Sequence, residues 1–157
     1  MDESSVRRLI AGFTIVMGPL LVFVSAVRAD AVPDREAIVR ALKLLPRQPY
    51  NVLIVDSDAA QPPRHGKGQK VEAFVNHDDR VVYLVKGGVT LRQASNKGGI
   101  FDYALATVIW HEMAHIDGAD ELNAQLEEER LWRQFIVARR VDTVRGLQYL
   151  GLLKKRH

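Results

Sequence analysis

The sequence predicts an α+β domain in which helices and strands occupy separate parts of the chain. Apolar residues recur at helical spacing before residue 46 and again after residue 100, and three short β-type runs lie between these segments. A turn-rich separator between two of the runs indicates a small antiparallel sheet. The expected order is one helix, this sheet, a second helix and a long final helix.

The first helix and the strands are delimited by proline and glycine. Pro33 suits a first helical turn, and Pro46 ends the segment. The first β-type run is Tyr50–Val55, and the Pro- and Gly-containing stretch 56–70 is expected to be a loop. Val71–Val75 and Val81–Val85 are expected to pair as an antiparallel hairpin.

Two helices are expected in the remainder of the chain. The first runs from about residue 101 to 117, without proline, and Gly118 stands where a left-handed C-terminal residue is expected. The second is expected to continue from Glu121 to about Gln148, with the acidic run Glu127–Glu129 on its solvated face.

The N-terminus indicates export. Arg7 and Arg8 precede the apolar run 9–27, and small residues before Asp30 resemble a cleavage site, so residues 1–29 are expected to be a signal peptide. The run is also long enough to span a membrane, and a retained anchor with membrane association through residues 9–27 is the alternative. The rest, residues 30–157, is expected to form one domain that is periplasmic, secreted or membrane-anchored.

Composition excludes several classes of function. The 157 residues contain no cysteine, so disulfides, thiolate nucleophiles and cysteine-type zinc sites are excluded. The net charge is +3, and residues 1–29 contribute +1 of it, which leaves +2 on the predicted domain. This near-neutral balance does not indicate a nucleic-acid partner.

The sequence His111-Glu112-Met113-Ala114-His115 predicts a metal site on the second helix. Residues four apart lie on one helical face, with Cβ atoms roughly 5–6 Å apart, so His111 and His115 can bind one zinc ion. Glu112 lies beside the helical face that carries the two histidines. There its carboxylate can take a proton from zinc-bound water and pass it to a leaving amine. The alternative is two histidines that merely pack on an amphipathic helix.

Two histidines leave a catalytic zinc short of one protein ligand. The spacing His111…His115-x-x-Gly118-x-x-Glu121 resembles the metzincin pattern, with Glu in place of His or Asp. The sequence Glu121-x-x-Ala124-Gln125 instead resembles the second helix of gluzincins, in which the Glu binds zinc. Both resemblances imply Glu121 as the third ligand. Asp120 is the alternative ligand, and both acids would also suit a helix N-terminus.

The gluzincin pattern is the better match, because metzincins need a methionine after the motif and this chain has none there. The chain departs from that pattern at Gln125, where the family has an Asp that orients a histidine ligand. Asp117 or Asp120 is expected to supply the missing carboxylate. Tyr103 and Tyr149 are both candidates to stabilise an oxyanion.

The whole order of elements resembles a minimal zincin, and specifically a small gluzincin-like metallopeptidase. The resemblance implies that Val81–Val85 forms the edge of the cleft, where a peptide or protein substrate binds by strand addition. It implies Zn2+ on His111, His115 and Glu121, with Glu112 as general base and then general acid. Two rival hypotheses are a catalytically quiet zinc-binding or membrane-anchored interaction module, and another metal hydrolase. Peptide deformylases, an example of the latter, use a Cys ligand that this chain lacks.

Overall fold

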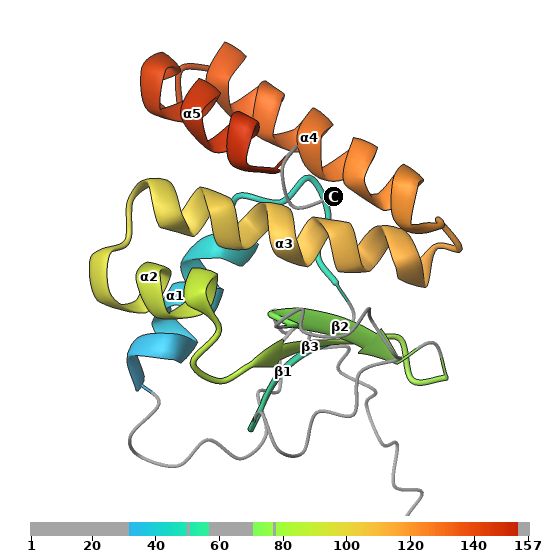
Figure 1. The fold of residues 1–157 in the computed structure, drawn as a ribbon. Coiled ribbons are helices and arrows are strands. Elements are labelled where there is room, and N and C mark those ends of the chain that lie inside the picture. Colours follow the sequence, from blue (N-terminus) through green and yellow to red (C-terminus); the bar gives the residue numbers. More distant parts are fainter. Residues whose placement is uncertain (1–31, 50, 57–70, 77, 154–157) are drawn as a thin grey trace, which may run out of the picture.

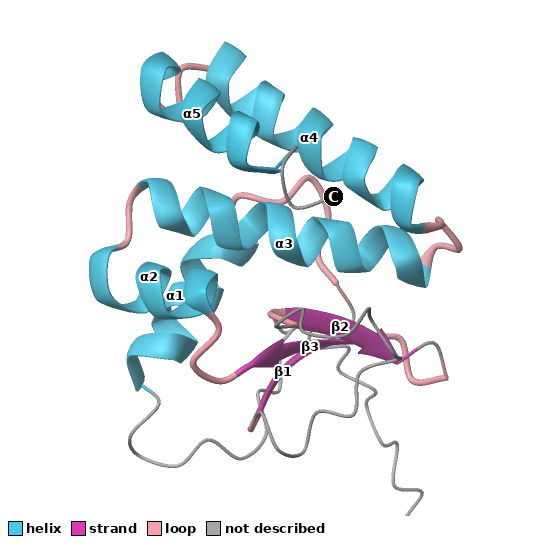
Figure 2. Ribbon diagram, viewed as in Figure 1, coloured by secondary structure: helices cyan, strands magenta, loops and turns pink. Residues whose placement is uncertain are grey.

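The structure is a computed structural model, and it describes residues 32–49, 51–56, 71–76 and 78–153. These residues form an α+β fold of five helices and a three-stranded sheet (Figures 1 and 2). The elements are, in chain order, α1 (Val32–Leu42), β1 (Asn51–Val55), β2 (Ala73–Asn76), β3 (Val81–Val85), α2 (Val89–Lys97), α3 (Ile100–Ile116), α4 (Glu121–Val137) and α5 (Thr143–Leu153). The predicted fold class is confirmed.

The sheet is mixed, so the expectation of an antiparallel sheet is only partly right. The hairpin between β2 and β3 is antiparallel as predicted, but β1 pairs with β3 in parallel, and the strand order is β1-β3-β2. The sequence between β1 and β2 is long enough for β1 to reach the far side of β3, which a tight hairpin would not allow.

The edge strand next to α3 is β2, whereas Val81–Val85 was predicted to form that edge. Strand β3 is central and pairs on both sides, so its backbone groups cannot accept an added strand. Strand β2 pairs only with β3 among the described strands, and it packs against α3. The edge available for strand addition next to α3 is therefore Ala73–Asn76.

Helix α3 lies between the sheet and the α4–α5 pair, and α1 and α2 cover its N-terminal part (Figure 1). This central position explains why most of its residues are apolar and why it is buried on several sides. The largest fully buried side chains include Leu105 and Ile109 from α3, Leu84 from β3 and Trp132 from α4. All of these residues belong to one core.

A partly buried ion pair fixes the N-terminal end of α3. Asp102 in its first turn is almost fully buried, and the Arg40 side chain of α1 donates from Nε to both of its carboxylate oxygens, at 3.2 and 3.1 Å. The same guanidinium donates to the carbonyl of Ala94 on α2 at 2.9 Å. One arginine therefore ties three helices together at the start of the helix that carries the His111 motif.

The C-terminal segment forms a helical hairpin instead of the single helix predicted for 121–148. Helix α4 ends at Val137, and Arg139 follows with a φ of 55°, in the left-handed region that stops a helix. Asp142 then accepts from the backbone N–H of Arg145 at 3.0 Å and so caps the start of α5. Helix α2 was not predicted either, because its sequence is short and polar.

The N-terminal segment 1–29, predicted to be a signal peptide or an anchor, lies outside the described residues. Within the described part of the chain, no helix has the length and apolar character that a membrane span requires.

Candidate metal site

Helix α3 carries His111 and His115 on one face, as predicted from their spacing. The helix ends at Ile116, and Gly118 has a φ of +92°, which confirms the predicted left-handed residue. The backbone N–H of Ala119 donates back to the carbonyl of Ala114 at 2.9 Å. This tight turn reverses the chain within four residues, so the first residue of α4, Glu121, faces the two histidines.

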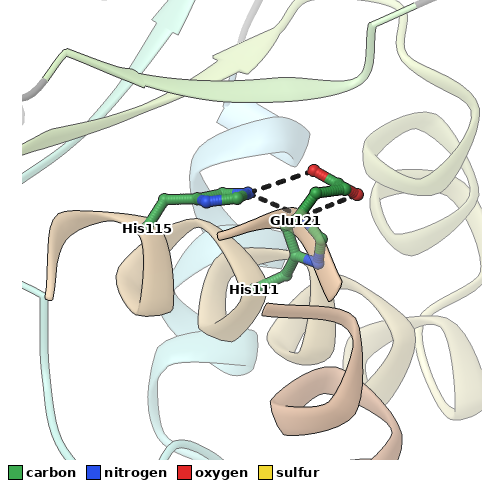
Figure 3. A group of neighbouring side chains, drawn as sticks. All are labelled: His111, His115 and Glu121. Carbon is green, nitrogen blue, oxygen red and sulfur yellow. Dashed lines mark hydrogen bonds and ion pairs between the residues drawn. The ribbon is translucent and has the colours of Figure 1, made fainter. Parts of the chain in front are cut away.

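The three side chains converge on one point (Figure 3). The Nε2 atoms of His111 and His115 lie 3.2 Å apart. The Glu121 carboxylate lies 3.7 Å from Nε2 of His111 and 3.3 Å from Nε2 of His115. Two ligands bound at about 2.0–2.1 Å to one tetrahedral ion are about 3.3 Å apart. The spacing of the donor atoms therefore fits a single ion, and this His-His-Glu group could hold a metal.

Hydrogen bonding orients the ring of His115. Its Nδ1 lies 2.9 Å from the carbonyl oxygen of Ala119, in the turn between α3 and α4. A carbonyl can only accept, so Nδ1 carries the hydrogen and donates, and Nε2 keeps its lone pair for a cation. The hydrogen bond to the carbonyl of Ala119 in this turn thus sets the tautomer of His115.

The ring of His111 is oriented by Glu128. One carboxylate oxygen of Glu128 lies 3.3 Å from Nδ1 of His111, and Glu128 is only 7% exposed. This contact also directs Nε2 of His111 toward the point where the three candidate ligands converge. Glu128 was predicted to lie on the solvated face of α4, and that prediction was wrong. Its position seven residues after Glu121, two helical turns along the same face, was the signal that could have identified it.

The residues that were expected to orient a ligand histidine in place of Glu128 have other partners. Gln125 donates to Glu121 at 2.8 Å and thereby holds the candidate ligand rather than a histidine. Asp117 forms ion pairs with Arg47 and Arg80. The Asp120 carboxylate accepts from the backbone N–H of Asn123 at 2.8 Å, which is the N-cap role considered as its alternative.

Glu112 is buried next to the three candidate ligands. Burial raises the pKa of its carboxyl to about 7; His111 opposes this shift, and the negative charges of Glu121 and Glu128 add to it. Burial acts to lower the pKa of His111, but the interaction of its Nδ1 with the Glu128 carboxylate and the charges of Glu112 and Glu121 outweigh it, so this pKa is raised. The site thus concentrates three carboxylates around two imidazoles, an arrangement that favours a bound cation.

Neither candidate oxyanion-stabilising tyrosine lies among these residues. Tyr103 packs edge-on against Phe135, with ring centroids 4.9 Å apart, and Tyr149 packs on Trp132 at 4.3 Å. Trp132 lies 11 residues beyond Glu121 on α4, or about 16 Å along a helix. Both tyrosines therefore belong to the packing between helices.

Comparisons with models of protein families, with curated proteins and with solved structures found no match to this chain.

Proposed function

We propose that the protein is a zinc-dependent metallopeptidase, with His111, His115 and Glu121 as the metal ligands and Glu112 as the catalytic acid–base residue. The observation that carries this proposal is the convergence of three donor atoms at the spacing of a tetrahedral site, with a buried glutamate beside them. The resemblance of the motif and of Glu121 to the gluzincin pattern points to the same chemistry.

The donor set favours zinc over other common cations. Two imidazole nitrogens and one carboxylate are an ordinary ligand set of catalytic zinc, whereas magnesium and calcium prefer oxygen ligands alone. Three protein ligands leave one tetrahedral position for water or substrate. The Glu121 side chain is 54% exposed, so this proposed ligand lies at the protein surface.

When bound, zinc supplies Lewis-acid chemistry, because it polarises a carbonyl group and lowers the pKa of a water molecule. Glu112 moves the protons. Its carboxylate accepts a proton from the attacking water and then donates it to the leaving amine. Such a group works best when its pKa lies near the working pH, and burial raises that of Glu112 to about 7.

Glu128 is a positioning residue in this proposal. It touches no substrate, but its contact with Nδ1 holds the ring of His111 in the orientation that presents Nε2. Carboxylates that hold a ligand histidine in this way typically increase metal affinity by 10–100-fold.

The proposed substrate is an extended peptide that pairs with β2. This strand lies at the edge of the sheet and packs on α3, which carries both histidines. Backbone hydrogen bonds to a free edge bind an extended chain with little regard to its sequence. An unstructured protein is therefore the appropriate first substrate.

The purified full-length chain should contain about one zinc ion per molecule and should hydrolyse an unstructured protein. A chelator should stop the hydrolysis, and added zinc should restore it. Zinc bound at this stoichiometry without cleavage of any member of a broad peptide library would exclude the peptidase. The function would then be the metal-stabilised interaction module.

A further inference from the structure

Helix α5 carries large apolar side chains on two opposite faces. Leu150 and Leu153 are buried in the core, whereas Val144 and Leu147 are 64% and 55% exposed. The helix packs against α4, and the α4–α5 pair lies on the side of α3 away from the sheet (Figure 1). A helix that is apolar on all sides is usually covered on all sides, so the outer face of α5 indicates a contact with something outside this domain.

The exposed apolar residues are accompanied by unpaired positive charge. The α4–α5 turn and the first turn of α5 bear Arg139, Arg140 and Arg145, all exposed. None of the ion pairs formed within the described ranges involves these three arginines. The only acidic residue between positions 137 and 153 is Asp142, whose carboxylate caps α5. The surface is therefore both apolar and cationic.

We propose that this surface docks on an anionic lipid membrane. It is called the α5 patch here and consists of Val137, Arg139, Arg140, Val144, Arg145 and Leu147. An interfacial helix places its apolar side chains at the boundary between headgroups and acyl chains, while flanking basic residues bind anionic headgroups. Val137, the last residue of α4, is 83% exposed and lies two residues before Arg139.

Two features favour a lipid surface over a second copy of the chain. In a two-fold contact the same patch meets itself, so the unpaired arginines of both copies would face each other and repel. The anionic headgroups of a lipid surface instead complement the charge of the three arginines.

The α5 patch and the candidate metal site lie at opposite ends of α4. Glu121 begins this helix and Val137 ends it, a separation of about 24 Å along the axis. Docking through the patch would leave the metal site accessible to solvent. The proposal rests on the exposed residues at the end of α4, in the α4–α5 turn and on α5, and it does not depend on the proposed peptidase activity.

The test uses the full chain, which has no native cysteine, so that a single introduced cysteine can carry a fluorophore sensitive to polarity. The label is placed at Leu147→Cys in the patch, with Asn96→Cys on α2 as the matched exposed control. We expect vesicles of phosphatidylcholine with phosphatidylglycerol to increase and blue-shift the emission at position 147, but not at position 96. Vesicles of phosphatidylcholine alone should cause a much smaller change.

Charge reversal tests the role of the arginines. Arg139→Glu, Arg140→Glu and Arg145→Glu combined should weaken the response at position 147 by at least about tenfold. The same reversal at three exposed cations on or directly after α1 and α2, Arg35, Lys43 and Arg92, should weaken it much less. A label at Val144→Cys provides the same readout if the first labelled variant does not fold.

Three outcomes would overturn the proposal. These are equal responses at positions 147 and 96, a response that does not depend on anionic lipid, and equal effects of the two sets of charge reversals. Light scattering without vesicles provides a further check. A dimer that the α5 patch reversal converts to monomer would show that a second copy covers this surface.

Discussion

A carboxylate oxygen of Glu128 lies 3.3 Å from Nδ1 of His111, across the interface between α4 and α3. This contact links the two helices that supply the candidate metal ligands, and it is buried on both sides. A buried carboxylate without a partner would be unfavourable, so the contact both orients the histidine and stabilises the interface.

Removing the charge of Glu128 should weaken metal binding without removing a ligand. We expect Glu128→Gln to reduce the affinity for zinc by 10–100-fold, measured by competition with a chromophoric chelator. The visible spectrum of the cobalt-substituted protein should change as well, because the orientation of His111 changes. Glu127→Gln, at the exposed neighbour that pairs with Arg130, is the control and should alter neither measurement. Equal affinities for the two variants would assign Glu128 to packing alone.

The third ligand can be distinguished from its neighbour by one pair of variants. Glu121→Ala should lose zinc almost completely, as should His111→Ala and His115→Ala, because two protein ligands hold the ion weakly. Asp120→Ala should keep zinc and lose only the N-cap of α4, about 0.5–2 kcal/mol of stability. Native mass spectrometry gives the metal content, and urea unfolding gives the stability. Zinc loss in Asp120→Ala alone would move the ligand to Asp120.

Local sequence signals predicted most of the elements but not how they pair or where α4 ends. Short apolar runs of β-type residues give β1 and β3, yet only their packing on the helices determines that β1 joins β3 in parallel and makes β3 central. The helical pattern from Glu121 onward continues through Arg139, and its left-handed φ depends on the capping by Asp142 and on the packing of α5.

The closeness of α4 and α5 predicts opposite effects for two alanine substitutions. A Cβ atom at Gly146 would lie 2.7 Å from Cγ1 of Ile136, so Gly146→Ala should destabilise the protein by about 1–3 kcal/mol. A Cβ atom at Gly151 would meet nothing within 4 Å, so Gly151→Ala should stabilise it by up to about 1 kcal/mol. Thermal unfolding of the two variants checks this. Stabilisation by both would mean that α5 does not pack against Ile136.

The sequence predicted those site residues that are marked by their spacing along the chain. It did not predict the residue whose role depends on being buried. His111, His115 and Glu121 follow from spacing along two helices and from resemblance to the gluzincin pattern. Glu128 stands inside the run Glu127–Glu129, and residue type alone does not show which of three consecutive acids faces the interior. The helical phase set by Glu121 selects the middle one, because seven residues make nearly two whole turns.

Replacing Glu112 with glutamine should separate metal binding from catalysis. The side chain is buried and is not one of the three converging donors, so Glu112→Gln should retain one zinc ion and the native fold. The amide cannot accept the proton of the attacking water, and the rate of hydrolysis should fall by about 10²–10⁴-fold. Zinc content, circular dichroism and cleavage of an unstructured protein are measured on the same samples. Glu129→Gln, at an exposed ion pair with Arg133 on α4, is the control and should keep full activity. If wild type and Glu112→Gln cleave at the same rate, Glu112 is not the acid–base residue.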